Sequence, residues 1–159
     1  RAGADPERTT LEVTDSLLSD NGWAGIAVSA GHRVSIESSR FEENAECGIC
    51  FLGTGDGSVQ ASRFTGNHVG VAVLGTSAPV VRGNRFSGGE VGIQVGGDAR
   101  PTIDGNRIGQ AKRAAVVYTD RATGVLRGTV CTRVRVGIAL ARTALPTLID
   151  NDCTVVRAP

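Results

Sequence analysis

Hydrophobic and polar residues recur along this chain with a period of 22 or 23 residues. Each unit contains one apolar residue, which we call the anchor, with an aliphatic residue five positions before it. The anchors are Leu18, Phe41, Phe64, Phe86, Ile108, Cys131 and Cys153. A fixed period of this length is typical of solenoid proteins, in which each unit forms one turn of a coil.

A second apolar block follows six or seven residues after each anchor. It begins with a pair of residues, of which the first is Gly or Ala and the second is Ile, Val or Ala. Another apolar residue comes two positions after the second member of the pair. The pairs are Gly25-Ile26, Gly48-Ile49, Gly70-Val71, Gly92-Ile93, Ala114-Ala115 and Gly137-Ile138. Short alternating stretches separated by Gly, Pro, Asp, Asn and Ser predict strands and turns, and no unit has ten residues of helical periodicity.

Stacked coils bring equivalent residues to the inter-strand distance of ~4.8 Å, so that like residues pack on like. The anchors then form an internal apolar stack. The small hydrogen-bonding residues two positions before the anchors form a polar ladder: Ser16, Ser39, Ser62, Asn84, Asn106, Thr129 and Asn151. In such a ladder, each buried side chain can satisfy a neighbour in the next coil.

The pattern predicts an all-β fold, a right-handed single-stranded parallel β-helix of about six to seven coils of 22–23 residues. We expect residues 1–159 to form a single domain of a longer chain. A leucine-rich repeat has a similar period but needs several Leu in each unit and a helix-like return segment. With nine Leu in total, and glycine where that segment would lie, the sequence does not fit it.

Composition narrows the choice of partners. The 159 residues include 22 Gly, no Met and 4% aromatic residues, and the formal net charge is +1. A near-neutral chain without interleaved Arg and aromatic residues does not resemble a nucleic-acid-binding protein. No run approaches the ~20 apolar residues that cross a bilayer, so no membrane partner is expected.

Two units carry a family resemblance. The two stretches are residues 80–86 (VVRGNRF) and 102–108 (TIDGNRI), and each is followed by an expected strand that contains a pair of the Gly-Ile type. They resemble pectate-lyase-type right-handed β-helix repeats of the carbohydrate-binding and sugar-hydrolase kind. The resemblance covers nearly the whole chain and implies the fold. It leaves function open, because such repeats occur in polysaccharide lyases, glycosidases, alginate epimerases and substrate-recruiting proteins.

An arginine precedes the anchor in four consecutive units, namely Arg40, Arg63, Arg85 and Arg107. On a strand this position faces away from the buried anchor, so four guanidinium groups should line one outer face. Such a column can bind sulfates, carboxylates or phosphates. Alternatively, nearby carboxylates neutralise it as an ordinary solvated face. The candidates are Glu37, Glu42, Glu43 and Asp104.

Catalytic carboxylates are not expected. In the outward column four positions before the anchors, the only acids are Glu37 and Asp104, three coils or roughly 14 Å apart. Paired glycosidase carboxylates lie about 5 to 9.5 Å apart. No anchor spacing exceeds 23 residues, so no long insertion walls a cleft. If the chain is an enzyme, Asp104, Arg127 and Asp150 are the remaining candidates.

A second outward stripe is apolar and follows the Gly-Ile pairs: Ala27, Cys50, Ala72, Gln94, Val116 and Ala139. Two positions further on, Leu52, Leu74 and Tyr118 are also expected to face outward. Contiguous apolar surface marks contact sites. Only Trp23 and Tyr118 are then available to stack on a sugar, which disfavours a glycan platform.

The cysteines are expected to be structural. Cys47 and Cys50 are three apart on a strand and should face opposite sides, which disfavours redox pairing or chelation. Cys131 and Cys153 share the anchor column, where a bridge is geometrically feasible, although two stacked reduced thiols are favoured. This interpretation favours a reducing cytoplasm over secretion. With only His32 and His68 besides, we expect no metal and no cofactor.

These observations favour a non-catalytic recognition or scaffold module that binds a protein partner or an anionic ligand such as an acidic polysaccharide. A polysaccharide lyase or glycoside hydrolase is the alternative, and a structural spacer is a further one. Because solenoids need covered terminal coils, we also expect end-to-end self-association or neighbouring domains.

Overall fold

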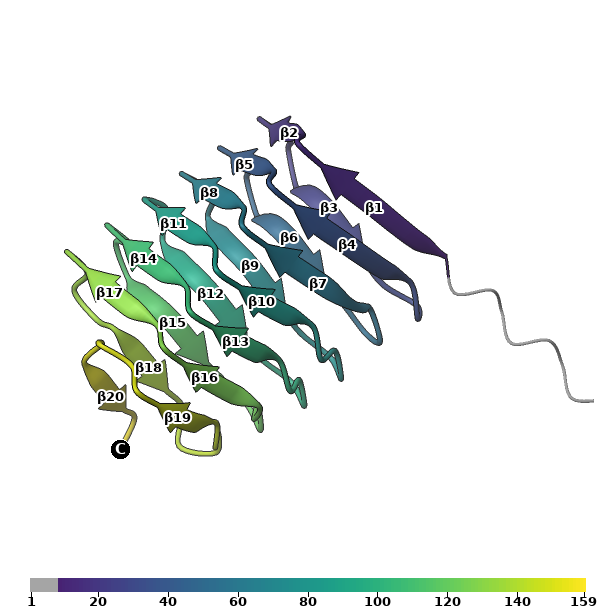
Figure 1. Cartoon of the computed structure of the whole chain (residues 1–159). Helices are drawn as coiled ribbons and strands as arrows, with labels where there is room; N and C mark the ends of the chain where they lie inside the picture. The colour runs from purple at the N-terminus through teal and green to yellow at the C-terminus, as the bar shows by residue number, and fades with distance from the viewer. Residues whose placement is uncertain (1–8) are drawn as a thin grey trace, which may run out of the picture.

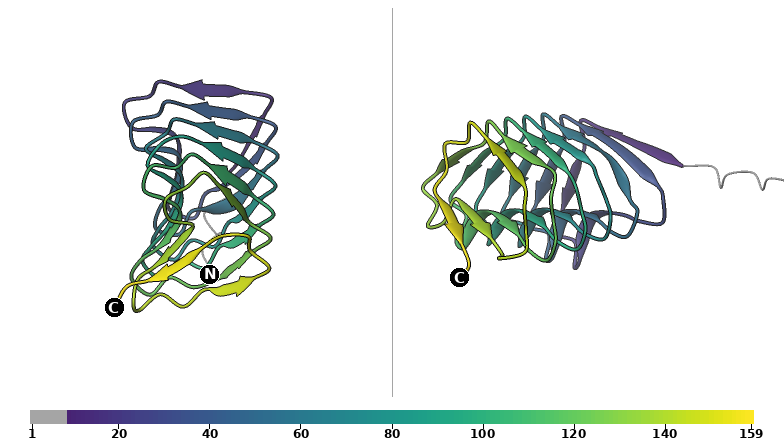
Figure 2. Two further views of the ribbon diagram at one scale, coloured as in Figure 1. Left: turned by 90° about the vertical axis from the view of Figure 1, so that its left-hand side faces the viewer. Right: turned by 90° about the horizontal axis from the view of Figure 1, so that it is seen from below.

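The computed structural model describes residues 9–159, which form a parallel β-solenoid of 20 strands (Figure 1). Every strand pair within it is parallel, and each strand pairs with its equivalents in the neighbouring coils. The coils stack along one axis from β1 to β20, as the two further views show (Figure 2). The predicted coil architecture is therefore confirmed. Residues 1–8 of the expected 1–159 domain lie outside the described part.

Three sheets form the sides of the coil, and we name them A, B and C in chain order. Sheet A contains β1 (Thr10–Thr14), β4 (Arg33–Glu37), β7 (Asp56–Gln60), β10 (Val80–Arg82), β13 (Thr102–Asp104), β16 (Val125–Arg127) and β19 (Thr147–Ile149). Sheet B contains β2 (Leu17–Ser19), β5 (Arg40–Glu42), β8 (Arg63–Thr65), β11 (Arg85–Ser87), β14 (Arg107–Gly109) and β17 (Val130–Thr132). Sheet C contains β3 (Ala24–Val28), β6 (Cys47–Phe51), β9 (Val69–Val73), β12 (Val91–Val95), β15 (Ala114–Tyr118), β18 (Ile138–Leu140) and β20 (Val155–Arg157).

The corner between sheets A and B is turned by one residue in the left-handed conformation, followed by the ladder residue. In the described coils this residue is Asp15, Ser38, Ala61, Gly83, Gly105, Gly128 or Asp150, with φ between 46° and 64°. The positive φ redirects the chain sharply between two extended strands. Because this corner has the same length in successive coils, the arginine position of sheet B stays in register from coil to coil.

The anchors form the predicted internal stack. Phe41, Phe64 and Phe86 lie face to face, with ring centroids 5.0 and 4.6 Å apart and interplanar angles of 8° and 10°. Ile108 continues the stack and is fully buried. Parallel in-register strands impose this geometry, because each ring can only meet the ring of the next coil.

Glycine is needed in sheet C opposite these rings. A Cβ built on Gly70 would lie 2.5 Å from Cδ1 of Phe86 and 2.6 Å from the carbonyl oxygen of Gly92. Where the anchor of the following coil is the smaller Cys131, the equivalent position is Ala115. The smaller anchor is compatible with a side chain at this position, although the unit with Cys153 as its anchor also has a glycine there, Gly137.

Two polar ladders cross the interior. In the predicted one, the Asn84 side chain accepts a hydrogen bond from the Ser62 backbone N–H at 2.9 Å and donates to the Val59 carbonyl at 2.9 Å. It also donates to Oδ1 of Asn106 at 3.1 Å. The exception is Thr129, whose buried hydroxyl has no hydrogen-bond partner within the described structure. The ladder is thus confirmed apart from this rung.

A second ladder was not predicted and lies at the corner between sheets B and C. Asn21 Nδ2 donates to Oδ1 of Asn44 at 2.8 Å, and Asn44 Nδ2 donates to Oδ1 of Asn67 at 2.8 Å. Asn44 and Asn67 are buried. The first three coils therefore have hydrogen-bonded polar side chains at two corners, the one between sheets A and B and the one between sheets B and C.

One prediction about sheet C is wrong by a single residue. The register pairs Ile93 with Val116 and Val95 with Tyr118, so the pair equivalent to Gly92-Ile93 is Ala115-Val116 rather than Ala114-Ala115. This coil has one residue more than the preceding coil, and the additional residue lies in the corner between β14 and β15. Val117 therefore takes the outward place expected for Val116.

The same shift directs the Tyr118 side chain into the core. Its side chain is fully buried among the core residues, so the expectation of an exposed aromatic ring is wrong. Burial away from water raises the pKa of its phenol, and its hydroxyl has no hydrogen-bond partner within residues 9–159. Trp23 is half exposed, in the first coil.

Candidate anion-binding surface

The four predicted arginines lie in register on consecutive strands of sheet B. Arg40 pairs with Arg63, Arg63 with Arg85, and Arg85 with Arg107. All four are exposed, because the preceding ladder residue and the following anchor both point inward. The structure thus brings them together as one outward column, which we call the arginine column.

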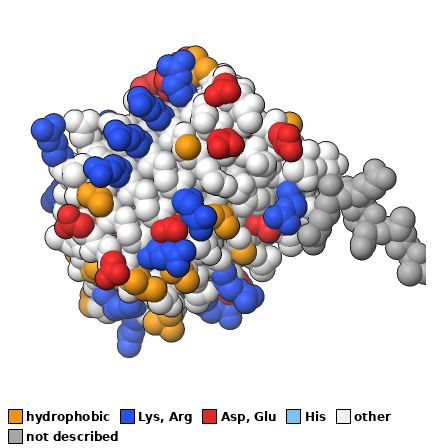
Figure 3. Space-filling view, viewed as in Figure 1, with side chains coloured by type: hydrophobic (Ala, Val, Ile, Leu, Met, Phe, Trp, Pro, Cys, Tyr) orange, Lys and Arg blue, Asp and Glu red, His pale blue; other side chains and the backbone are white. Residues whose placement is uncertain are grey.

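The space-filling view shows a row of Lys and Arg side chains along the edge of the molecule that carries β5, β8, β11 and β14 in Figure 1 (Figure 3). Neighbouring members are one coil apart, which corresponds to ~4.8 Å between backbones. The four charges therefore form a line parallel to the solenoid axis, with one charge for each coil.

Carboxylates neutralise little of this column. Arg40 lies 3.8 Å from Glu42, and both side chains are substantially exposed. Within residues 9–159, Arg63, Arg85 and Arg107 form no ion pair. Such a contact between exposed charges contributes ~0–1 kcal/mol, so most of the column keeps its charge unpaired.

Asp104, one of the expected neutralising residues, is engaged elsewhere. It lies on the outer face of sheet A between Arg82 and Arg127, with N···O distances of 3.2 and 3.1 Å. The hydrogen bond from Arg127 and the charges of both arginines hold the pKa of this carboxyl below its usual value of 3.8, against the opposing effect of desolvation. An acid held ionised in this way is a poor proton donor at neutral pH.

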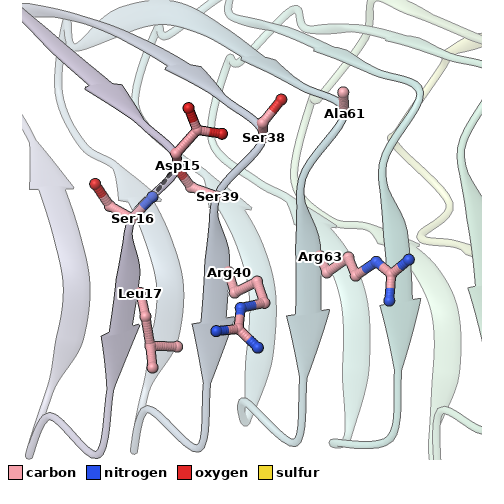
Figure 4. Close-up of a pocket in the computed structure, with 8 residues that line it drawn as sticks. All are labelled: Asp15, Ser16, Leu17, Ser38, Ser39, Arg40, Ala61 and Arg63. Atoms are coloured by element: carbon pink, nitrogen blue, oxygen red, sulfur yellow. Dashed lines mark hydrogen bonds between the residues drawn. The ribbon is translucent and has the colours of Figure 1, made fainter.

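Two open depressions flank the arginine column. The first, of about 370 Å³, lies at the corner between sheets A and B, and Figure 4 shows Arg40 and Arg63 along one side of it. Its lining residues are Asp15, Ser16, Leu17, Ser38, Ser39, Arg40, Ala61 and Arg63. It combines two guanidinium groups with hydroxyl and backbone groups and with one carboxylate, that of Asp15, so the side that can receive an anion is the one formed by Arg40 and Arg63.

The second depression, of about 520 Å³, lies over the far end of the column, toward sheet C. Arg85 and Arg107 line it together with Arg133, which was not predicted. Arg133 stands two positions after the anchor Cys131, where earlier coils have Asp20, Glu43, Gly66, Gly88 or Gln110, so no repeated arginine marked it. It adds a fifth guanidinium group beside the column.

The outer face of sheet C carries a cluster of small apolar side chains from adjacent coils. Cys47 and Cys50 both point outward because Gly48 and Ile49 between them both point inward. The expectation that the two cysteines face opposite sides is therefore wrong, and the structure joins them in a disulfide with their Cα atoms 5.9 Å apart. Small apolar residues of adjacent coils, such as Val69 and Ala72, pack in one cluster with these cysteines and are themselves buried.

Cys131 and Cys153 also form a disulfide, with their Cα atoms 5.1 Å apart in adjacent coils. The bridge was recognised as geometrically feasible, but the preference for two reduced thiols is wrong. The argument for a reducing compartment, which relied on reduced cysteines, loses its basis.

Other chemistry finds no support in the part of the chain that the structure describes. Residues 9–159 contain no group of three or more His, Cys, Asp or Glu side chains able to hold a metal ion. Nor do these residues include a helix long and apolar enough to cross a membrane. Asp150 lies in an exposed turn, and Arg127 is bound to Asp104.

Parallel strands in a three-sided coil, with internal stacks of like residues and asparagine ladders, define the class of right-handed parallel β-helix proteins. Comparison with known families agrees: the model described as "Right handed beta helix region" matches residues 5–153, and the chain belongs to this family. No curated protein matches the chain. The family establishes the fold and its handedness.

Proposed function

We propose that this β-helix is a non-catalytic recognition module that binds an anionic ligand along the arginine column. The carrying observation is that Arg40, Arg63, Arg85 and Arg107 stand in register while three of them have no carboxylate partner within the described residues. Guanidinium groups bind carboxylates, sulfates and phosphates through paired hydrogen bonds. The ligand class is an acidic polysaccharide or an acidic surface of a protein.

Electrostatics supports a ligand at this face. Two like charges 4 Å apart repel by about 1 kcal/mol in bulk water, and neighbouring arginines here are only slightly further apart at their backbones. An anionic ligand would remove this repulsion and gain attraction from each guanidinium group. An unneutralised column is therefore a surface whose free energy falls when anions bind.

The geometry favours an extended ligand over a single ion. Four groups with a spacing of ~4.8 Å span roughly 14 Å along the axis. A linear polyanion laid along the axis can place successive charges on successive coils, whereas one small anion can reach only one or two guanidinium groups. The two open depressions beside the column leave room for the uncharged parts of such a chain.

A binding experiment tests the proposal. The chain would be titrated calorimetrically with polygalacturonate, a sulfated polysaccharide, a polyglutamate peptide and a neutral polysaccharide, at low and at physiological salt. We expect binding to at least one polyanion, none to the neutral chain, and weaker binding as salt screens the charges. Release of reducing or unsaturated ends would be recorded in parallel, and product formation would contradict a non-catalytic role.

Matched variants localise the site. The double variant Arg85→Ala, Arg107→Ala removes two members of the column. The control Arg33→Ala, Arg100→Ala removes two exposed arginines outside it. With ~0.7 kcal/mol for each exposed ion pair, the first variant should bind about tenfold more weakly. Equal loss in both variants would mean that net charge, rather than the column, governs binding.

The two ligand classes are separated by the same panel. Binding of polyglutamate but of neither polysaccharide would assign the column to an acidic protein partner. If no polyanion binds at low salt, the recognition proposal fails and a structural spacer becomes the better interpretation.

A further inference from the structure

We propose that the depression over the far end of the arginine column, besides giving a ligand room, is a subsite for one tetrahedral anionic ester group, a sulfate or a phosphate monoester. This inference rests on the proposed function, because the ester belongs to the ligand of the column. The first observation is the composition of the lining, which includes three arginines, two hydroxyl side chains and one amide but no carboxylate. These polar residues are Arg85, Arg107, Arg133, Ser87, Thr132 and Gln110.

Gly109 lies at the centre of this lining. In the register of sheet B it stands between Ser87 on β11 and Thr132 on β17, at an outward position where both neighbouring coils carry a side chain. The strands β11, β14 and β17 follow one another along the rod (Figure 1). A Cβ built on Gly109 would lie 3.0 Å from the Thr132 Oγ1, so this hydroxyl borders the space that the glycine leaves open.

The three arginines stand on two sides of Gly109. Arg85 and Arg107 are register partners at the start of β11 and β14, beside the corner with sheet A. Arg133 follows β17, at the corner toward sheet C. A group that lies over Gly109 therefore has a guanidinium group on either side of it.

The uncharged polar groups of the depression are able to donate to an anion. Ser87 Oγ donates to Oε1 of Gln110 at 3.1 Å, so the acceptor oxygen of this amide is already engaged. Its Nε2 amino group remains available as a donor, and the hydroxyl of Thr132 can rotate to donate as well. An anion in this depression thus meets both charged and neutral donors.

The arginines of the subsite are not neutralised by the described residues. Within residues 9–159, Arg85, Arg107 and Arg133 form no ion pair. On its other side, Arg133 lines a neighbouring depression together with Asp152. This carboxylate competes with a ligand for Arg133, so that removing it should strengthen the subsite.

The number of donors favours a tetrahedral group over a carboxylate. A carboxylate has two oxygens in one plane, and a single guanidinium group satisfies both through parallel hydrogen bonds. A phosphate monoester offers three acceptor oxygens that point in different directions, and a sulfate monoester has the same shape. Three guanidinium groups around one hollow can each bind one of these oxygens. The depression at the near end of the column has two arginines and the carboxylate of Asp15, so it suits such a group less well.

The test compares sugars that differ only in their anionic group. The probes are glucose with a sulfate ester, a phosphate ester or a carboxylate at its sixth carbon, and glucose itself is the neutral control. Binding to the isotope-labelled chain at low salt would be followed by amide NMR. We expect at least one ester to bind about fivefold more tightly than the carboxylate, with shifted amides at Gly109 and Gln110. The ester that binds more tightly identifies the group that the ligand carries.

Three variants locate the subsite through its charges. Arg133→Ala removes a guanidinium group that belongs to the depression but not to the column, and it should weaken ester binding about fivefold. Arg63→Ala is the matched control, because it removes a member of the column that does not line the depression. Asp152→Asn removes the competing carboxylate and should strengthen ester binding.

A fourth variant, Gly109→Val, fills the hollow without changing any charge. Valine has the shape of threonine, which occupies the equivalent positions 65 and 132, so the strand should tolerate it. A thermal unfolding curve verifies that the variant is folded. The matched control Thr65→Val places the same residue two coils earlier. We expect the preference for esters over the carboxylate to disappear in Gly109→Val and to persist in the control.

The subsite and the proposed function fail separately. Esters that bind no more tightly than the carboxylate overturn the subsite, and so do esters that bind the folded Arg133→Ala and Gly109→Val variants as tightly as the unmodified chain. Polyanion binding that depends on Arg85 and Arg107 would still support the column in that case. If the esters bind at Gly109 but no polyanion binds, recognition along the column fails and the subsite alone is supported.

Discussion

Asn84 offers the sharpest test of how the ladder stabilises the coil. Replacing it with leucine, of similar length but without polar atoms, removes a side chain that is 1% exposed. The Ser62 backbone N–H then loses its only acceptor in the ladder, and the Val59 carbonyl loses a donor. Both groups stay buried in the interior, where water cannot replace the asparagine.

The size of the effect follows from these two bonds. A buried donor left without a partner costs ~1–3 kcal/mol, and a lost bond between neutral groups costs ~1 kcal/mol. The backbone N–H of residue 84 still donates to Asn106 Oδ1, because that bond does not use the Asn84 side chain. We therefore expect the free energy of unfolding to fall by about 2–4 kcal/mol.

Chemical denaturation followed by far-ultraviolet circular dichroism measures this change. Gln60→Leu is the matched control, because it replaces an exposed polar side chain on the outer face of sheet A, where substitutions usually change stability by less than ~0.5 kcal/mol. An Asn84→Leu curve that coincides with that of the control would refute the energetic role of the ladder.

Four further changes test other parts of the structure. Thr129→Asn should raise stability by about 1 kcal/mol, because it gives the ladder an amide where a buried hydroxyl now has no partner; a denaturation midpoint that falls instead would contradict this. Gly70→Ala should destabilise by ~1–3 kcal/mol, since the new methyl group would overlap an aromatic ring and a backbone carbonyl; an unchanged midpoint would show that the ring moves freely. Because the pKa of Asp104 is lowered in the folded state, its ion pairs stabilise the protein above pH 3.8 and lose this effect as the pH falls below it. Asp104→Asn should therefore be less stable than the unmodified protein at pH 7, with a difference that shrinks at pH 3. Reducing the Cys131–Cys153 bridge, which closes a separation of 22 residues, should lower stability by about 3 kcal/mol more than the same treatment lowers the stability of a variant with alanine at both positions, in which the reductant breaks only the Cys47–Cys50 bridge.

The columns were predictable because the fold converts sequence period into spatial neighbourhood. Once the coil length is known, Arg63 must lie beside Arg85, and Phe64 beside Phe86, since parallel in-register strands allow no other pairing. The polar ladder followed for the same reason. No long-range contact had to be guessed.

The errors arose where one residue is gained or lost between strands. The insertion before β15 changes the side on which Tyr118 lies, because neighbouring residues of a strand point to opposite faces. Strict alternation also fails at Gly48-Ile49, where two consecutive residues point inward and bring Cys47 and Cys50 to one face. Such local departures depend on packing against the anchors, which the period alone does not encode.

The second asparagine ladder escaped for a different reason. Asn21, Asn44 and Asn67 recur in only three coils, and the equivalent place in the fourth is glycine. A column of three among seven coils resembles ordinary turn composition, where asparagine is common. Its hydrogen bonds become evident only when the corner geometry is known.

The contrast between two outer columns bears on the proposed function. On sheet A, Arg82 and Arg127 lie on either side of Asp104, so that consecutive coils alternate in charge and form ion pairs. On sheet B, Arg63 and Arg85 follow one another with no acid between them. The same scaffold thus accommodates alternating charges one coil apart, and nothing in its backbone geometry requires like charges to stack. Since a run of like charges costs stability when nothing binds it, the unpaired column is better explained by a ligand that supplies the missing anions than by the demands of the fold.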